Sequence, residues 1–277
     1  MPGPDQLAGR TAVITGGASG IGAALSAELG ARGMSVVVAD IDGADARRLA
    51  RELGESGIPA LGIRVDVSDP ESVDALVQAS YAEFGSVEVL CNNAGVLAFG
   101  TVAESSLGDW RWLSSVNIEG MLNCLRAFLP RMRERTGWRH VMNTASTHAF
   151  LPEPQGTSLY SATKHAIVGL SLGLRAELAP DGIGVTILCP GQVATRILDS
   201  QRNRPDVFGP PAADLFGTGT VPMAIEPGVV ARDAVEGMLR GAPFVFSLPA
   251  HDHDRFRAQF EELWRLAGDA LNDSVEP

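Results

Sequence analysis

The chain is poor in the features that mark several classes of protein. Its three cysteines, Cys91, Cys124 and Cys189, lie far apart in apolar runs and show no metal-ligand spacing. No apolar run approaches the roughly 20 residues that a membrane-spanning helix needs. Residues 1–10 lack the charged segment and apolar core of a secretory signal. We therefore expect a cytoplasmic protein with buried free thiols and no metal site.

Basic residues are also scarce. The chain has 22 Lys and Arg against 33 Asp and Glu, which gives a formal net charge of −11. Nucleic acids and anionic membrane surfaces are bound by basic surface, so neither is an expected partner. The acidic excess is expected to serve solubility.

Short apolar runs alternate with longer helical patterns along the chain. The runs lack polar alternation, which predicts strands buried on both faces of a parallel sheet with helices on both sides. The fold class that we expect is α/β, a single Rossmann-type doubly wound domain over residues 1–277 with about seven strands. Strands are expected at 11–15, 34–40, 61–67, 87–91, 140–144, 185–189 and 244–248. Helices are expected at 20–32, 44–53, 70–84, 110–135 (with a kink at Pro130), 160–179, 229–240 and 254–270.

Residues 192–226 break this rhythm. The segment is rich in Pro and Gly and carries scattered apolar residues: Ile197, Leu198, Val207, Phe208, Leu215 and Phe216. Long irregular segments inside compact domains often serve as lids or binding loops. We expect a substrate lid here, followed by a C-terminal strand and helix at about 244–271.

A glycine-rich turn follows the first expected strand. The segment Gly16-Gly17-Ala18-Ser19-Gly20-Ile21-Gly22 separates this strand from a helix. That order places backbone N–H groups and the positive end of the helix against a pyrophosphate. Gly16 permits a tight turn, while Gly20 and Gly22 let the phosphates and the neighbouring strand come close. Because glycine turns also serve as plain loops, the flanking strand and helix carry much of this interpretation.

Asp40 ends the second expected strand, at about the 20-residue distance from the glycines that is typical of a ribose-binding carboxylate. Such a carboxylate accepts hydrogen bonds from the adenosine ribose and repels a 2′-phosphate. No Arg or Lys lies in the glycine turn or directly after Asp40. The sequence therefore predicts NAD(H) in preference to NADP(H). The alternative is that Asp40 only caps the next loop.

Further motifs run along the chain in one order: Thr15-Gly16-x-x-x-Gly20-Ile21-Gly22, Asp66-Val67, Asn92-Asn93-Ala94-Gly95, Asn117, Ser146, Tyr160-x-x-x-Lys164 and Pro190-Gly191. In this order and at about these spacings they resemble the short-chain dehydrogenase/reductase family. The resemblance covers residues 7–195 and the strand near Phe244. It implies an NAD-preferring alcohol dehydrogenase or ketoreductase.

Tyr160 and Lys164 lie one turn apart on an expected helix and so share a face. Hydride transfer to a ketone leaves an alkoxide that needs a proton, and Tyr160 can supply it as a general acid. A free tyrosine titrates at about pH 10, and we expect the charge of Lys164 to lower the pKa of Tyr160. Ser146 follows the strand that ends near Thr144, and its hydroxyl can donate to the substrate oxygen.

The resemblance implies roles for other residues. Lys164 would also hold the nicotinamide ribose, and Asn117 would anchor a water that relays protons from this lysine to solvent. The residues implied to line the adenine side are Asp66, Val67 and Asn93. Those implied to flank the nicotinamide carboxamide are Pro190, Gly191, Val193 and Thr195.

The catalytic residues also have plain structural interpretations. A tyrosine and a lysine four residues apart on a helix are usually a surface pair. Asn117 can be a hydrogen-bonded core amide, and Ser146 can cap a strand end. Because the four residues occur together in the expected order, the catalytic interpretation is favoured.

Several histidines, tryptophans and aspartates have both a functional and a structural interpretation. His148 and His165 can contact substrate or lie at the surface, and both remain open. Trp110 and Trp112 are expected to pack rather than to bind substrate. The run His251–Asp254 is interpreted as a polar turn that opens the last helix, not as a metal site.

The substrate is expected to contact Val96–Phe99, His148–Leu151 and the lid, which are mostly apolar. This composition favours an apolar or weakly polar secondary alcohol or ketone over a phosphorylated sugar or a coenzyme A thioester. An acidic substrate remains open because the lid carries Arg196, Arg202 and Arg204.

Two alternatives to the dehydrogenase are an enoyl reductase and a non-catalytic sensor or scaffold. Enoyl reductases of the family space the tyrosine and lysine more widely, and non-catalytic sensors or scaffolds typically lose one of the two residues. The family also assembles through the helix that bears the tyrosine and through the C-terminal strand and helix. This implies a homodimer or homotetramer, and it leaves the packing of the acidic tail at 268–277 open.

Overall fold

The computed structural model describes residues 6–151, 156–212 and 224–273. In this part of the chain one parallel sheet has the strand order β3-β2-β1-β4-β5-β6-β7. Its strands are β1 (Thr11–Thr15), β2 (Ser35–Asp40), β3 (Ala60–Arg64), β4 (Val89–Asn92), β5 (Arg139–Thr144), β6 (Ile183–Pro190) and β7 (Phe244–Ser247). The predicted doubly wound α/β fold is confirmed.

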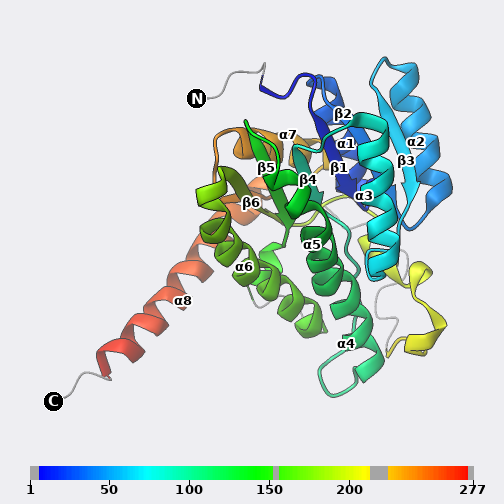
Figure 1. Cartoon of the computed structure of the whole chain (residues 1–277). Helices are drawn as coiled ribbons and strands as arrows, with labels where there is room; N and C mark the ends of the chain where they lie inside the picture. The colour runs from blue at the N-terminus through cyan, green and yellow to red at the C-terminus, as the bar shows by residue number, and fades with distance from the viewer. Residues whose placement is uncertain (1–5, 152–155, 213–223, 274–277) are drawn as a thin grey trace.

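Helices cover both faces of the sheet (Figure 1). One apolar core lies between the sheet and α1 (Gly20–Ala31), α2 (Gly43–Glu55) and α7 (Pro227–Leu239). The other lies between the sheet and α3 (Pro70–Phe84), α5 (Gly120–Arg133) and α6 (Ser158–Leu178). Two further helices are α4 (Leu107–Ser114) and α8 (His253–Asp273).

The apolar runs of the sequence explain why the sheet is covered on both sides. Side chains alternate across a strand, so Ala12 and Ile14 of β1 enter one core while Val13 between them enters the other. Every residue of β1 is buried. A strand buried at every position therefore fits between two layers of helices.

The starts of the helices follow capping rules. Asp69 caps α3 by accepting the N–H of Glu71, and Pro70 occupies the first turn, as the sequence predicts. Ser106 and Asp109 form a capping box at the start of α4. These caps fix where each helix leaves the sheet.

The expected continuous helix over 110–135 is wrong in one respect. A π-helical turn, Ser115–Glu119, separates α4 from α5, whereas Pro130 lies inside α5. Helical periodicity in the side chains does not distinguish the two hydrogen-bond registers, so the sequence gives no sign of this turn. π-turns inside helices often occur at functional sites, and this one contains Asn117.

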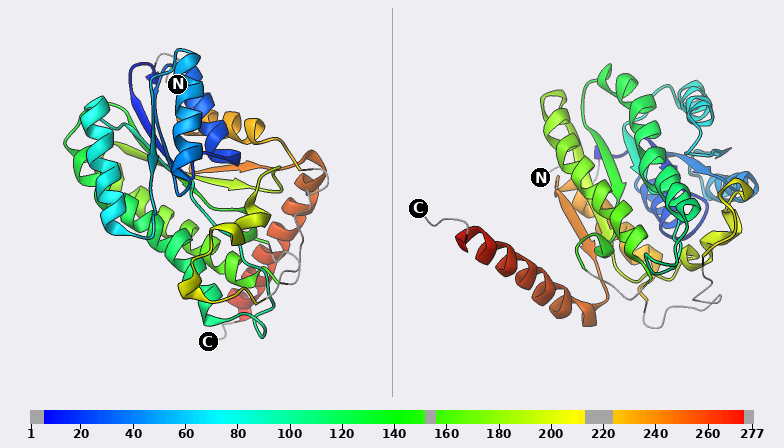
Figure 2. Two further views of the ribbon diagram at one scale, coloured as in Figure 1. Left: turned by 90° about the vertical axis from the view of Figure 1, so that its right-hand side faces the viewer. Right: turned by 90° about the horizontal axis from the view of Figure 1, so that it is seen from below.

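The C-terminal helix α8 projects away from the rest of the molecule in the views of Figures 1 and 2. In its first two turns, Phe256 and Phe260 stack on each other and meet the rings of Phe150 and Phe246 in tilted or edge-on contacts. Farther along, Trp264 is 77% exposed. The base of α8 is thus packed on the domain, while its outer half presents apolar side chains to solvent.

Two further expectations from the sequence concern membrane-spanning helices and metal sites. Within these residues, no helix is both long and apolar enough to cross a membrane. No cluster of three or more His, Cys, Asp or Glu side chains suited to a metal occurs among them either. The run His251–Asp254 forms a short turn and the first residues of α8, and the three cysteines are buried and free.

Candidate active site

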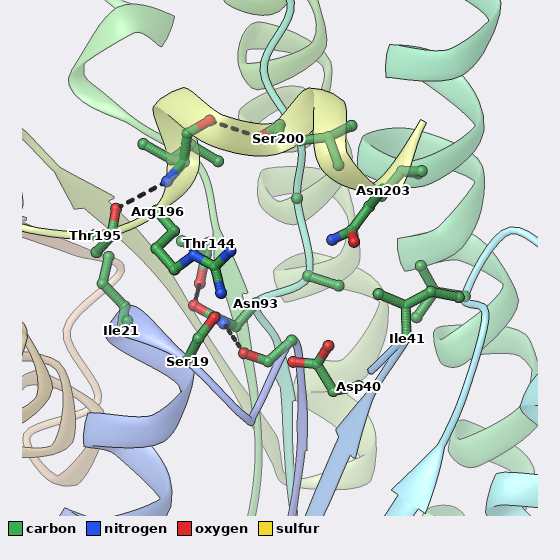
Figure 3. Close-up of a pocket in the computed structure, with 18 of the residues that line it drawn as sticks. Ser19, Ile21, Asp40, Ile41, Asn93, Thr144, Thr195, Arg196, Ser200 and Asn203 are labelled. Atoms are coloured by element: carbon green, nitrogen blue, oxygen red, sulfur yellow. Dashed lines mark hydrogen bonds between the residues drawn. The ribbon is translucent and has the colours of Figure 1, made fainter. Parts of the chain in front are cut away.

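A cleft lies at the carboxyl edge of the sheet (Figure 3). The strand order reverses direction between β1 and β4, and such a switch point leaves a crevice where the strands end. Most of the predicted cofactor residues line this cleft: Gly16, Ser19, Gly20, Ile21, Asp40, Asp66, Val67, Asn93, Pro190, Gly191, Val193 and Thr195. Tyr160, Lys164 and Ser146 line the same cleft, so the sequence motifs converge in space.

The glycine turn leaves no room for side chains. A Cβ at Gly16 would lie 2.9 Å from the Cα of Ala94, and one at Gly20 would lie 2.9 Å from the Cγ2 of Thr195. Both glycines also have positive φ, 61° and 53°, which L-residues rarely adopt. Gly22 does not line the cleft but supports the turn from below, where a Cβ would overlap the carbonyl oxygen of Gly16.

The turn has the form of an anion cradle. Helix α1 begins at Gly20, and its N-cap residue Ser19 makes no side-chain capping bond. The first N–H groups of α1 and its positive end therefore face the cleft. A glycine turn that lines a cleft next to a helix N-terminus fits the pyrophosphate of a dinucleotide.

Asn93 fastens the turn rather than only lining the adenine side. Its Nδ2 donates to the carbonyl oxygens of Thr15 and Gly16 at 3.1 and 3.3 Å. In the loop after β3, Oδ1 of Asp66 accepts the hydroxyl of Ser68 at 2.6 Å. These contacts hold the loops around the cleft in a defined shape.

Asp40 stands at the end of β2 on the rim of the cleft (Figure 3). Its Oδ2 accepts the N–H of Ala18 in the glycine turn at 3.0 Å, and its Oδ1 accepts the N–H of Asp42 at 3.1 Å. Burial raises the pKa of the Asp40 carboxyl, and the two backbone N–H bonds offset part of that rise. Asp40 thus does cap the next loop, but it also faces the cofactor cleft.

Ser146, Tyr160 and Lys164 form the other end of the cleft. Ser146 begins the short turn after β5, and α6 carries Tyr160 and Lys164 on one face. The Nζ of Lys164 lies 5.5 Å from the centre of the Tyr160 ring and donates to the carbonyl of Thr144 at 2.9 Å. A hydroxyl, a phenol and an ammonium are therefore gathered at one place.

The pKa values of this group differ from the expectation. Burial raises the pKa of Tyr160 to about 12, and a hydrogen bond with Ser146 offsets part of the rise. Burial also lowers the pKa of Lys164 to about 8. Burial and the Ser146 hydrogen bond are the causes of the shift in the Tyr160 pKa, and the Lys164 ammonium is directed to the carbonyl of Thr144.

Asn117 does not line this cleft. Its Oδ1 accepts the N–H of Val96 at 2.8 Å, while its Nδ2 donates to the carbonyl of Val96 and the hydroxyl of Thr163, both at 3.0 Å. The side chain is 1% exposed. It therefore ties the loop after β4 to α6 as a hydrogen-bonded core amide, which is one of the two interpretations that the sequence left open.

His148 contacts two catalytic candidates. Its Nδ1 lies 3.3 Å from the Oγ of Ser146, and its ring meets the Tyr160 ring edge-on at 5.5 Å. Burial, and secondarily the charge of Lys164, lowers the pKa of His148 to about 4. The imidazole is consequently uncharged at neutral pH. His165 lies one layer away, against Phe150.

The wall beyond Tyr160 is apolar. Val96, Trp112, Ile197 and Phe208 line the cleft there, and Leu97 and Ala98 pack in the same cluster. Trp112, which was expected only to pack, is 1% exposed and also lines the cleft. Within the lid, Leu215 and Phe216 lie outside the described residues.

Arg204 is not available to an acidic substrate. Its Nη1 lies 2.8 Å from the Oδ1 of Asp109, with the two side chains 5% and 2% exposed. Its guanidinium also lies 5.2 Å from the centre of the Trp112 ring and donates to the carbonyl of Phe208 at 2.9 Å. This buried ion pair fastens the lid to α4. No local sequence signal indicates it, because Asp109 lies far away along the chain.

Arg196, Arg202 and Asn203 of the lid line the cofactor cleft. The sequence indicates the two arginines only as candidates for binding an acidic substrate, and it carries no motif that indicates Asn203. Figure 3 places Asn203 near Ile41, above the end of β2, and Arg196 on the side of Ser19. The lid therefore covers the dinucleotide part of the cleft as well as the substrate end.

Several known proteins have sequences similar to this chain. The sequence profile described as short chain dehydrogenase matches residues 10–206. A 1-deoxy-11-beta-hydroxypentalenate dehydrogenase of Streptomyces exfoliatus is 37% identical over 264 residues, covering 94% of this chain and 90% of the relative. Oxidoreductase UcpA of Escherichia coli K12 is 36% identical over 195 residues, covering 70% and 73%.

Solved structures agree with this relationship. A short chain dehydrogenase/reductase of Burkholderia phymatum in complex with NAD has a TM-score of 0.84 and 32% identity, covering 94% of this chain and 96% of its own. A 3-ketoacyl-(acyl-carrier-protein) reductase of Brucella melitensis complexed with NADH has a TM-score of 0.75 and 29% identity, covering 88% and 98%. The chain therefore belongs to the short-chain dehydrogenase/reductase family of oxidoreductases.

Proposed function

We propose that this protein transfers hydride between NAD(H) and a secondary alcohol or ketone, within a single catalytic domain over residues 1–277. One observation carries the proposal: Ser146, Tyr160 and Lys164 converge at one end of a cleft whose other end is the glycine turn and Asp40. When bound, the nicotinamide supplies or accepts the hydride. The neighbouring side chains then handle the proton.

Tyr160 is the general acid and base of this proposal. With its pKa raised to about 12, the phenol keeps its proton at neutral pH and can give it to the oxygen of a ketone. Ser146, which hydrogen-bonds with Tyr160, donates to the same oxygen. Lys164 holds a positive charge beside the phenol, and its Nζ is within reach of the cofactor ribose as the family resemblance implies.

NAD(H) is the proposed cofactor, in preference to NADP(H). Asp40 presents its carboxylate at the rim of the cleft, where an added 2′-phosphate would be repelled. The Burkholderia and Brucella structures are described as complexes with NAD and NADH. These names support the proposal for this chain.

The proposed substrate is an apolar secondary alcohol or ketone. The wall formed by Val96, Trp112, Ile197 and Phe208 offers apolar contacts. The Streptomyces relatives are named as dehydrogenases of 1-deoxy-11-beta-hydroxypentalenate, a hydroxylated compound. Their names support alcohol oxidation at a comparable site.

A cytoplasmic homo-oligomer is also part of the proposal. Helix α8 exposes Phe260 and, farther out, Leu263, Trp264 and Leu266, and α6 exposes Leu170 and Leu172. A second copy of the chain would remove these side chains from water.

Tyr160→Phe is the first test of the proposed chemistry. The variant lacks the acidic proton, so we expect turnover to fall at least about 100-fold, while NADH binding stays within about twofold. Turnover is measured by the absorbance of NADH with a panel of cyclic secondary alcohols and ketones. The matched control is Tyr81→Phe, which changes the only other tyrosine. Equal turnover of wild type and Tyr160→Phe would contradict the assignment.

Asp40→Asn tests the cofactor preference. Removing the charge is expected to raise the affinity ratio of NADPH to NADH by about tenfold, measured by fluorescence titration of both nucleotides. Asp42→Asn is the control, because Asp42 lies two residues away and caps α2, a role that Asn can also fill. Tighter binding of NADPH than of NADH by the wild type would overturn the NAD assignment.

The tyrosine pKa has a direct optical test. In Tyr81→Phe the single remaining tyrosine is Tyr160, so the ultraviolet absorbance of tyrosinate follows one group. Without cofactor we expect a midpoint of about 12, and a higher one after Ser146→Ala because the Ser146 hydrogen bond lowers this pKa. The raised pKa predicts that alcohol oxidation, which needs tyrosinate, speeds up as pH rises. A midpoint below the ordinary value of about 10 would show that Lys164 outweighs burial.

Trp264→Asp tests the assembly. We expect sedimentation of the wild type to give a multiple of 29.1 kDa and the variant to shift toward the single-chain mass, because a charge at the apolar contact opposes burial. Leu107→Asp is the control, since Leu107 is similarly exposed on α4. A monomeric wild type would contradict the proposed oligomer.

A further inference from the structure

The lid enters the cofactor cleft directly beside the glycine turn. The turn and the root of the lid touch at Gly20 and Thr195, where no Cβ could be inserted at the glycine. Arg196 is the next residue and lines the cleft. Figure 3 shows its side chain hanging from the lid into the cleft, on the side of Ser19. A guanidinium thus lies across the cleft from the first turn of α1.

Arg202 joins Arg196 at this position. Its Nη1 donates to the carbonyl oxygens of Arg196 and Asp199 at 3.0 and 2.7 Å, so it holds the turn from which Arg196 projects. Burial, and then the charge of Arg196, lowers the pKa of Arg202. The two guanidinium groups are therefore close enough to repel each other.

Three carboxylates act on this pair of arginines, and they are unevenly distributed between the two. Asp199 lies 3.1 Å from Arg196 and 3.7 Å from Arg202, so one carboxylate is shared by two guanidinium groups. Asp40 and Asp42 act on Arg202 from the end of β2. For Arg196, the only ion pair within the described part of the chain is the one with Asp199, and its side chain is 59% exposed.

The chemistry of this arrangement matches a diphosphate. Arg presents a planar fork of N–H donors that binds phosphate oxygens in pairs, and the N-terminus of α1 offers backbone N–H groups on the opposite side. We propose that Arg196, a residue of the lid, binds the pyrophosphate of the cofactor. On binding, the guanidinium of Arg196 exchanges its ion pair with Asp199 for the pyrophosphate, and Arg202 positions Arg196. This inference rests on the proposed NAD(H) site, and it adds Arg196 of the lid as a second phosphate-binding group opposite the N-terminus of α1.

The test compares ligands with and without the diphosphate on the full-length protein. NADH is titrated by fluorescence, and ADP and adenosine are titrated as its competitors. For Arg196→Gln we expect NADH and ADP to bind about tenfold more weakly, with adenosine changed less than about twofold. Arg196→Lys should recover part of the loss, since it restores the charge without the fork. Arg232→Gln, on the exposed face of α7, is the control and should bind all three ligands as the wild type does.

Each other outcome has a distinct meaning. Unchanged NADH and ADP affinity in Arg196→Gln would overturn the inference while leaving the proposed function intact. An equal loss for adenosine would also overturn it, because the substitution would then disturb the whole cleft. A wild-type protein that binds neither NADH nor ADP would overturn the proposed function itself.

Discussion

Close contacts between three loops, made at two glycines, hold the cleft together. Gly16 lies against Ala94 of the loop after β4, and Gly20 lies against Thr195 of the loop after β6, each without space for a Cβ. Asn93 fastens the first contact with its side-chain amide. The loop after β4 continues into Val96, which packs in the same cluster as Tyr160, and the loop after β6 continues into the lid. The glycine contacts therefore fix the distance between the glycine turn and the Tyr160 end of the cleft. Preorganised spacing of this kind is what a hydride transfer between two bound molecules requires.

Desolvation dominates the electrostatics at the catalytic end. Lys164 is the only lysine among 22 basic residues, and it is 3% exposed. Its pKa falls to about 8 while that of Tyr160 rises to about 12, so the amine loses its proton before the phenol does. An arginine could not respond in this way, because its guanidinium stays charged. Lys164 can therefore both hold a positive charge beside Tyr160 and release a proton.

Much of the fold could be predicted because its strands lack polar alternation, a pattern that is typical of a sheet covered on both faces. The cleft residues could be predicted because glycine geometry and motif order are local. What escaped prediction depends on contacts between distant segments. The ion pair of Arg204 with Asp109, and with it the place of Trp112 in the cleft wall, arises only after the lid has folded onto α4. The π-turn around Asn117 escaped because its side chains follow the same helical pattern as its neighbours.

The overall acidity of the chain and its affinity for an anionic dinucleotide are compatible because the relevant charges act over different distances. The net charge of −11 is spread over a surface where salt screens interactions beyond about 8 Å. Inside the cleft, the end of α1, Lys164 and the two lid arginines line the space that a dinucleotide would occupy, so they would act on its charges at short range. The same separation explains why net charge excludes extended polyanions, which need a broad basic surface. A single dinucleotide needs only a few positive groups placed at its diphosphate and ribose.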